Sequence, residues 1–114
     1  MDVGVVKEGC VHVASLSGEI ELGEEIKIAK VLQPLVADPH SKLAIDLSGL
    51  KQISSLGLSE LINVVTRSRL TKSRVVMFGP SSFVTSVFAA TRLNNWFDIV
   101  ADLPAARKTL GEPS

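Results

Sequence analysis

The sequence has no net charge. Its 114 residues carry twelve lysines and arginines against twelve aspartates and glutamates, so the formal net charge at pH 7 is +0. A chain without a broad positive field cannot hold a nucleic-acid backbone or an anionic membrane surface by charge alone. The composition therefore predicts neither nucleic acid nor a membrane as a partner.

Cysteine and long apolar runs are also scarce. Cys10 is the only cysteine, which excludes an internal disulfide and indicates a reducing compartment. No stretch approaches the roughly 20 apolar residues that span a bilayer. The first ten residues, MDVGVVKEGC, lack the basic and apolar segments of a secretory signal. We therefore expect a soluble cytoplasmic protein.

Histidine is limited to His12 and His40, which lie far apart in the sequence. Serine hydrolysis needs a histidine beside the nucleophile, and no Gly-x-Ser-x-Gly motif is present. A metal site needs several clustered ligands, which one cysteine and two distant histidines do not supply. The segment FGPSS lacks the glycine-rich loop and lysine of a Walker sequence, and it predicts a helix cap instead. We expect no enzyme, no metal and no cofactor.

What the sequence does contain is enough apolar material for one core. Hydrophobic residues make up 46% of the chain, and 114 residues is close to the commonest size of a single domain. No linker, internal repeat or low-complexity tract interrupts it. The sequence predicts one domain spanning residues 1–114.

Apolar periodicity predicts strands and helices in alternation. A hairpin of two strands comes first, and helices then separate three further strands, which favours a sheet with a largely parallel middle and the hairpin at one side. The expected strands are 3–9, 10–18, 42–50, 74–80 and 96–102, and the expected helices are 24–38, 55–70, 82–93 and 103–110. The fold class is α/β, with a mixed, mostly parallel sheet of about four to five strands and about four helices.

Four residues refine this pattern. Pro34 removes a backbone donor and is expected to end or kink the helix over 24–38. Ser48 and Gly49 form a turn-like pair that is expected to end the strand over 42–50. Trp96, the only tryptophan, is expected at a core edge at the start of the last strand.

Ser54 and Ser55 stand together before the apolar helix that begins at 55. Taken alone, serine at this place favours a helix cap, worth about 1 kcal/mol. A phosphate at a helix N-terminus would also be tolerated, because open N–H groups and the positive end of the helix dipole face it. Gly57 in the first turn indicates either close approach of another part of the chain or a tolerated terminal position.

Four landmarks resemble the STAS domain, the family of the bacterial anti-anti-sigma factors, and the resemblance covers nearly the whole chain. The segment SGEIEL is similar to the family's Gly-Glu-Leu-Asp segment, and LAIDLSGLKQISSLGL resembles its central strand and the serine-containing start of the next helix. VTSVFAATRLNNWFDI resembles the stretch that leads from an apolar helix to a Leu-Phe-x-Ile strand. The order of the expected elements is the fourth landmark.

The resemblance implies a function as a binding partner whose surface is switched. It predicts an anti-sigma factor antagonist that binds an anti-sigma factor with serine-kinase activity. This kinase is expected to inactivate the antagonist by phosphorylating Ser55, with Ser54 as the alternative site. Partner binding is expected on a face that contains Glu21, Ser54, Ser55, Gly57 and Ser59. The protein is expected to be a monomer or a weak dimer and to act in the regulation of transcription in bacteria.

The sequence departs from the family pattern beside the expected phosphorylation site. Ser54 stands where the best-known members have an aspartate, and Leu56 stands where they have a serine. A Ser-Ser form resembles other STAS branches. The alternative function is therefore a STAS interaction module without a phosphoswitch, in a stress-sensing or lipid-transport assembly.

Overall fold

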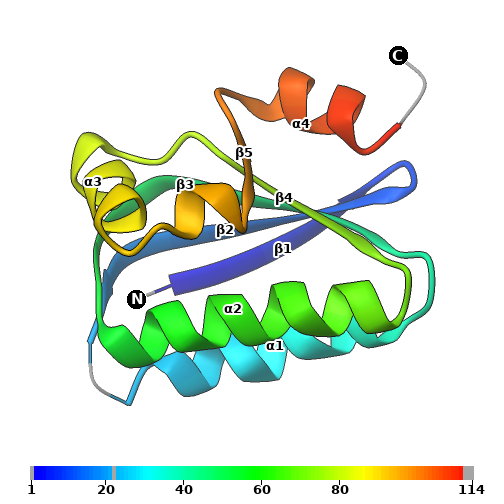
Figure 1. The fold of residues 1–114 in the computed structure, drawn as a ribbon. Helices are drawn as coiled ribbons and strands as arrows, with labels where there is room; N and C mark the ends of the chain where they lie inside the picture. The colour runs from blue at the N-terminus through cyan, green and yellow to red at the C-terminus, as the bar shows by residue number, and fades with distance from the viewer. Residues whose placement is uncertain (1, 22, 112–114) are drawn as a thin grey trace.

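The computed structural model describes residues 2–21 and 23–111, and they form a single five-stranded sheet with helices on both faces (Figure 1). The strands, in both chain and sheet order, are β1 (Asp2–Glu8), β2 (Val11–Ile20), β3 (Lys42–Ile53), β4 (Arg74–Phe78) and β5 (Asp98–Val100). The helices are α1 (Glu25–Ala37), α2 (Ser55–Leu70), α3 (Ser82–Ala90) and α4 (Leu103–Thr109), with a short 3₁₀ helix, η1, at Leu93–Asn95.

The pairing of the strands confirms the expected architecture. β1 and β2 form an antiparallel hairpin at one side, and β2, β3, β4 and β5 are parallel neighbours. Helices connect the parallel strands, because a parallel pair needs a crossover between its ends. The chain is an α/β protein with a mixed, mostly parallel sheet.

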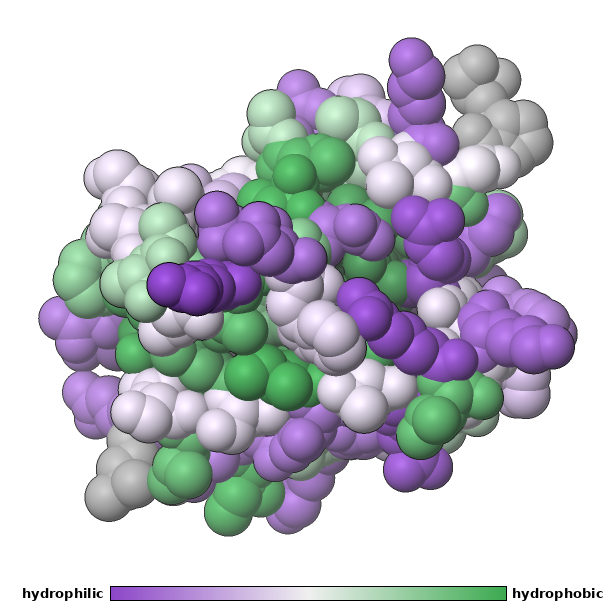
Figure 2. All heavy atoms as spheres, viewed as in Figure 1, coloured by the Kyte–Doolittle hydropathy of each residue, from purple (hydrophilic) through white to green (hydrophobic). Residues whose placement is uncertain are grey.

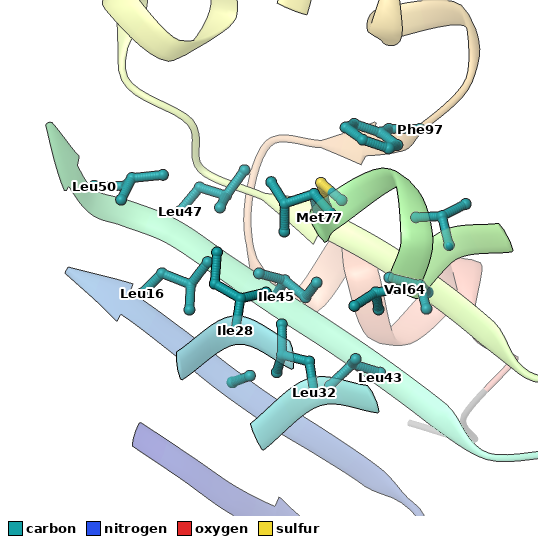
Figure 3. Close-up of a cluster of buried hydrophobic side chains, with 14 of the residues drawn as sticks. Leu16, Ile28, Leu32, Leu43, Ile45, Leu47, Leu50, Val64, Met77 and Phe97 are labelled. Carbon is teal, nitrogen blue, oxygen red and sulfur yellow. The ribbon is translucent and has the colours of Figure 1, made fainter. Parts of the chain in front are cut away.

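The sheet has an apolar core on each face. Side chains of α1 and α2 pack with Leu16, Ile45 and Met77 on one face (Figure 3). Phe88 of α3 belongs to the same cluster and meets Phe97 edge to face, with the two ring centroids 5.4 Å apart. On the other face Ala106 of α4 and Leu110, which directly follows this helix, lie in a cluster with Phe78. Strands buried on both faces are typical of parallel sheets, and this accounts for the continuous apolar runs in the middle of the sequence.

The strand over Lys42–Ile53 is longer than expected, because Ser48 and Gly49 do not form a turn. Ser15 pairs with Asp46, whereas Ser17 pairs with Gly49, so β3 carries an extra residue opposite β2. This is a β-bulge, which re-aims a strand without ending it. A Cβ on Gly49 would lie 2.9 Å from the Cβ of Ser17, so the glycine allows the two strands to approach.

Helix α1 likewise continues through Pro34 and ends at Ala37. Its buried residues are Ile28, Leu32 and Val36, while Ile26 is 54% exposed. Packing of this buried stripe accounts for the helix better than local propensity does, since most helical stability in proteins comes from tertiary packing. Helix α2, by contrast, has the bounds that the sequence predicts.

Candidate functional site

The start of helix α2 lies where two strands end together. Ile20, the last residue of β2, pairs with Ile53, the last residue of β3. The backbone N–H of Ser54 then donates to the carbonyl of Ile20 at 2.9 Å. The carboxyl ends of the two parallel strands therefore fix the point at which α2 begins. This point lies at the left-hand end of α2 in Figure 1.

Ser54 is the N-cap of α2. Its backbone is extended, with φ −76° and ψ 166°, and its Oγ accepts a hydrogen bond from the backbone N–H of Gly57 at 3.1 Å. This is the usual N-cap geometry, in which a side-chain oxygen satisfies one of the open donors of the first turn. Ser54 is half-buried. Its hydroxyl is thus already committed to the structure of the helix.

Ser55 occupies the first helical position and is exposed. Its carbonyl accepts a hydrogen bond from the Oγ of Ser59 at 3.1 Å. Among residues 2–21 and 23–111, none forms a hydrogen bond with the Ser55 hydroxyl. The two neighbouring serines therefore differ in kind, because one hydroxyl caps the helix and the other faces solvent.

Gly57 is buried beneath this surface. A Cβ at this position would lie 2.7 Å from Cγ2 of Ile20 and 3.0 Å from Cγ1 of Ile53. The missing side chain lets the first turn of α2 rest directly on the ends of β2 and β3. The close approach that the sequence left open is thus present, and Gly57 positions the site from below.

The remaining residues of the expected face lie around Ser55. Glu21 is exposed and directly follows β2, and Ser59 is exposed one turn along α2. The structure therefore brings Glu21, Ser54, Ser55 and Ser59 to the same end of the sheet. The binding face expected from the sequence does not include Leu56, which is 45% exposed beside Ser55. The sequence does indicate that Leu56 is exposed, because it falls outside the helical spacing of the apolar residues Leu58, Leu61, Ile62 and Val65.

The start of α3 repeats the same capping arrangement. Ser81 Oγ accepts a hydrogen bond from the backbone N–H of Val84 at 3.2 Å, which confirms the helix cap expected at FGPSS. The Ser81 hydroxyl also lies 3.5 Å from the carbonyl of Leu50, near the end of β3. Phe83, in the first turn of α3, is 51% exposed. This exposed aromatic residue lies outside the set of residues expected at the binding face.

Other kinds of site find no support in the part of the chain that the structure describes. His12 lies on β2 and His40 lies in the loop before β3. No group of three or more histidine, cysteine or acidic residues among the described residues is arranged to hold a metal ion. None of the helices described is long and apolar enough to cross a membrane.

Comparisons with known proteins agree on the fold. The family model described as "Mlab, STAS domain" matches residues 3–102. Similar solved structures include an anti-sigma-factor antagonist (STAS) domain protein from Planctomyces limnophilus, with 18% identity, a TM-score of 0.84 and coverage of 98% of this chain and 100% of that one.

Two further structures are similar over nearly their whole length. An anti-sigma factor antagonist from Mycobacterium paratuberculosis has 26% identity and a TM-score of 0.72, with coverage of 97% of this chain and 94% of that one. The Bacillus cell fate determinant SpoIIAA in its phosphorylated form has 14% identity and a TM-score of 0.73, with coverage of 95% and 99%. No curated protein sequence matches the chain significantly.

Proposed function

Because the chain belongs to the STAS domain family, we propose that it is an anti-sigma factor antagonist that binds an anti-sigma factor with serine-kinase activity and is switched by phosphorylation of Ser55. In this proposal the unphosphorylated form binds the anti-sigma factor and so releases the sigma factor that it holds. The kinase activity of the same partner modifies Ser55 and ends the interaction.

The observation that carries the proposal is the division of roles between the two serines. The Ser54 hydroxyl accepts the Gly57 N–H, whereas the exposed Ser55 hydroxyl lies beside it at the helix start. A kinase needs an accessible hydroxyl that can be modified without unfolding its surroundings. Ser55 meets this need, and Ser54 would lose its capping bond.

The folded domain can accept the added charge. Phosphorylation brings about −1.5 to −2 charges at neutral pH and three acceptor oxygens. At the start of α2 these oxygens meet the positive end of the helix dipole and the N–H groups of the first turn. Phosphorylation of Ser55 should therefore leave the domain folded.

The interface with the partner has no such tolerance. We place it on the exposed residues Glu21, Ser55 and Ser59, with Ser54 at its edge, Gly57 beneath it and Leu56 as its apolar component. A surface that is complementary to a neutral hydroxyl and a neighbouring leucine would have to desolvate the phosphate and accommodate its bulk. Phosphorylation therefore weakens binding rather than folding.

The experiment is phosphorylation by the partner kinase with mass-spectrometric mapping, followed by affinity and melting measurements. We expect phosphate on Ser55, a loss of affinity of about 100-fold or more, and little change in melting temperature. Ser55→Ala should bind and resist inactivation, Ser55→Asp should bind weakly, and the matched variant Ser54→Ala should still be phosphorylated. Phosphate on Ser54 would contradict the site assignment, and a large fall in melting temperature with unchanged affinity would contradict the mechanism.

A second function is a STAS interaction module without a phosphoswitch, in a stress-sensing or lipid-transport assembly. It is favoured because Ser54 occupies the position at which the best-known members have an acidic residue beside the phosphorylated serine. In this structure Ser54 caps the helix instead. The family model that matches also names Mlab in its description. The same experiment separates the two functions: partner binding that needs Leu56 and Ser59, with no phosphate on either serine in the presence of an active kinase, would favour this module.

A further inference from the structure

Acidic residues are missing from one long part of the sequence. Between Glu60 and Asp98 there is no aspartate or glutamate, although the chain as a whole is neutral. The basic residues of this stretch are Arg67, Arg69, Lys72, Arg74 and Arg92. The neutrality of the whole chain therefore hides a local excess of positive charge.

The fold gathers four of these basic residues at one end of the molecule. Arg67 and Arg69 lie in the last turn of α2, Lys72 lies in the turn that follows, and Arg74 begins β4. All four are exposed. This end of α2 is opposite Ser55, at a distance of about 24 Å for a helix of 16 residues at about 1.5 Å per residue.

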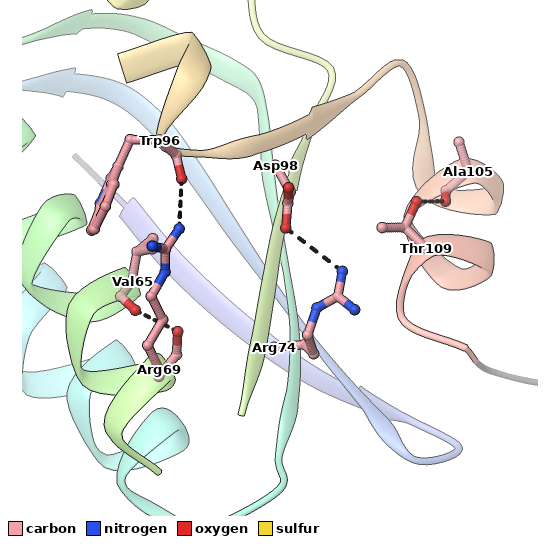
Figure 4. A network of polar contacts seen from close by, with 8 residues as sticks. Val65, Arg69, Arg74, Trp96, Asp98, Ala105 and Thr109 are labelled. Carbon is pink, nitrogen blue, oxygen red and sulfur yellow. Dashed lines mark hydrogen bonds and ion pairs between the residues drawn. The ribbon is translucent and has the colours of Figure 1, made fainter. Parts of the chain in front are cut away.

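Only part of this charge is compensated locally. Arg74 approaches Asp98 at 3.6 Å, and the guanidinium of Arg69 lies 3.8 Å from the ring centroid of Trp96 and donates to the Trp96 carbonyl at 3.2 Å (Figure 4). Neither Arg67 nor Lys72 forms an ion pair with any residue that the structure describes. Basic residues in the last turn of a helix interact favourably with the negative end of the helix dipole. This interaction accounts for the presence of Arg67 and Arg69 but not for that of Lys72 and Arg74.

Leu70 lies among these charges and is 81% exposed, the largest exposed fraction of the exposed large apolar residues. Trp96, beside Arg69, is 38% exposed, so the expectation of a core-edge position is met only in part. Figure 2 shows an apolar area at the right-hand end of α2 that is bordered by hydrophilic side chains. Helix packing within the domain gives no reason for a leucine to project into water here.

We propose that this basic pole, made of Arg67, Arg69, Leu70, Lys72, Arg74 and Trp96, docks on the surface of an anionic lipid membrane. Exposed lysines and arginines are attracted to anionic headgroups within a Debye length of the surface. A leucine and a tryptophan among them enter the boundary between headgroups and acyl chains. The expectation of no membrane partner was based on net charge, which does not describe how charge is distributed over the folded surface.

The projecting leucine is the reason to choose a lipid surface over other anionic partners. A nucleic-acid backbone offers no apolar medium for Leu70, and one ring face of Trp96 is already covered by Arg69 and so is not available for stacking. An acidic protein would need a preformed pocket to receive the leucine. A fluid headgroup layer receives a projecting side chain without one.

This proposal is independent of the proposed switch. The basic pole and Ser55 lie at opposite ends of α2, so a partner on Ser55 and a membrane at the pole can be bound together. Failure of the lipid test would leave the role of Ser55 untouched, and the reverse also holds.

The test is co-sedimentation with vesicles of phosphatidylglycerol and phosphatidylcholine in equal parts, against vesicles of phosphatidylcholine alone. We expect binding to the anionic vesicles only, and its loss at high salt. Arg67→Gln with Lys72→Gln should lower the partition coefficient roughly tenfold or more, because each basic residue near the surface contributes about a fivefold change. Leu70→Ser should lower it with all charges retained.

Matched controls are Lys30→Gln with Lys51→Gln, which remove the same charge from exposed positions outside the pole, and Ile26→Ser, which removes another exposed apolar side chain. These variants should bind as the unaltered protein does. No sedimentation of the unaltered protein, or equal losses in pole and control variants, would overturn the proposal. Binding to poly-L-glutamate without binding to vesicles would also overturn it, and would assign the pole to an acidic protein partner.

Discussion

At the scale of single residues, the main feature is that two identical side chains have different roles. Ser54 has extended backbone angles and caps α2, while Ser55 has helical geometry and an exposed hydroxyl. The difference arises because Ile20 accepts the Ser54 N–H and so fixes where the strand ends. The contact with the end of β2 therefore sets which of the two serines caps the helix.

This leads to a stability prediction for the unmodified domain. Ser54→Ala removes the acceptor of the Gly57 N–H and should lower the free energy of unfolding by about 1 kcal/mol. Ser55→Ala changes an exposed side chain without a capping bond, and it should stay within a few tenths of a kcal/mol of the unaltered protein. Urea unfolding measures both. Equal losses, or a larger loss for Ser55→Ala, would show that the capping assignment is wrong.

At the scale of secondary-structure elements, the contact between α2 and the strand ends decides how the site is held. Gly57 lies against Ile20 and Ile53, both of them β-branched and therefore stiff at χ1. The bulge of β3 between Asp46 and Gly49 lies nearby, where β3 continues toward the start of α2. The position of Ser55 thus depends on packing between elements more than on the sequence of the helix itself.

Gly57→Ala tests this packing against helix propensity. Alanine should stabilise a helix by about 1 kcal/mol relative to glycine. Here its Cβ would meet Ile20 at 2.7 Å, and overpacking of this kind costs about 1–3 kcal/mol. We expect a net loss of about 1 kcal/mol in urea unfolding, whereas Ser59→Ala, at an exposed position of the same helix, should be neutral or slightly stabilising. A stabilised Gly57→Ala variant would mean that the first turn is not pressed against β2.

At the scale of the whole molecule, the sheet depends on cover for both faces. Helices α1, α2 and α3 cover one face, and the other is covered by α4 with Ala106 and by Leu110, the residue after it. An ion pair between Arg107 and Glu8 joins this last helix to the first strand. Since both residues are partly exposed, the pair contributes little, and apolar burial holds α4 in place.

Ala106→Glu should therefore be strongly destabilising. Ala106 is fully buried, so a carboxylate there would lack both water and a partner. We expect a loss of about 2 kcal/mol or more in the free energy of unfolding, compared with a change of about 0.5 kcal/mol or less for Lys108→Glu on the exposed side of the same helix. Similar effects of the two substitutions would indicate that α4 does not protect the sheet.

Local patterns in the sequence determined the elements and their order. Apolar periodicity gave α2 its bounds, and the alternation of strands with helices gave the parallel middle of the sheet. Four landmarks spread along the chain, one of them the segment that contains Ser54 and Ser55, indicated the family. These features are readable because each depends on residues close together in the chain, whose spacing sets which face they share.

Tertiary structure alone decided what depends on distant partners. Whether Ser48 and Gly49 turn or continue a strand depends on Ser17 of β2, and which serine caps α2 depends on the carbonyl of Ile20. Continuation of α1 past Pro34 follows burial of Leu32 and Val36 against the sheet. The basic pole is likewise invisible in a net charge of +0, because charges cancel in a sum over the sequence but act at the places where the fold puts them.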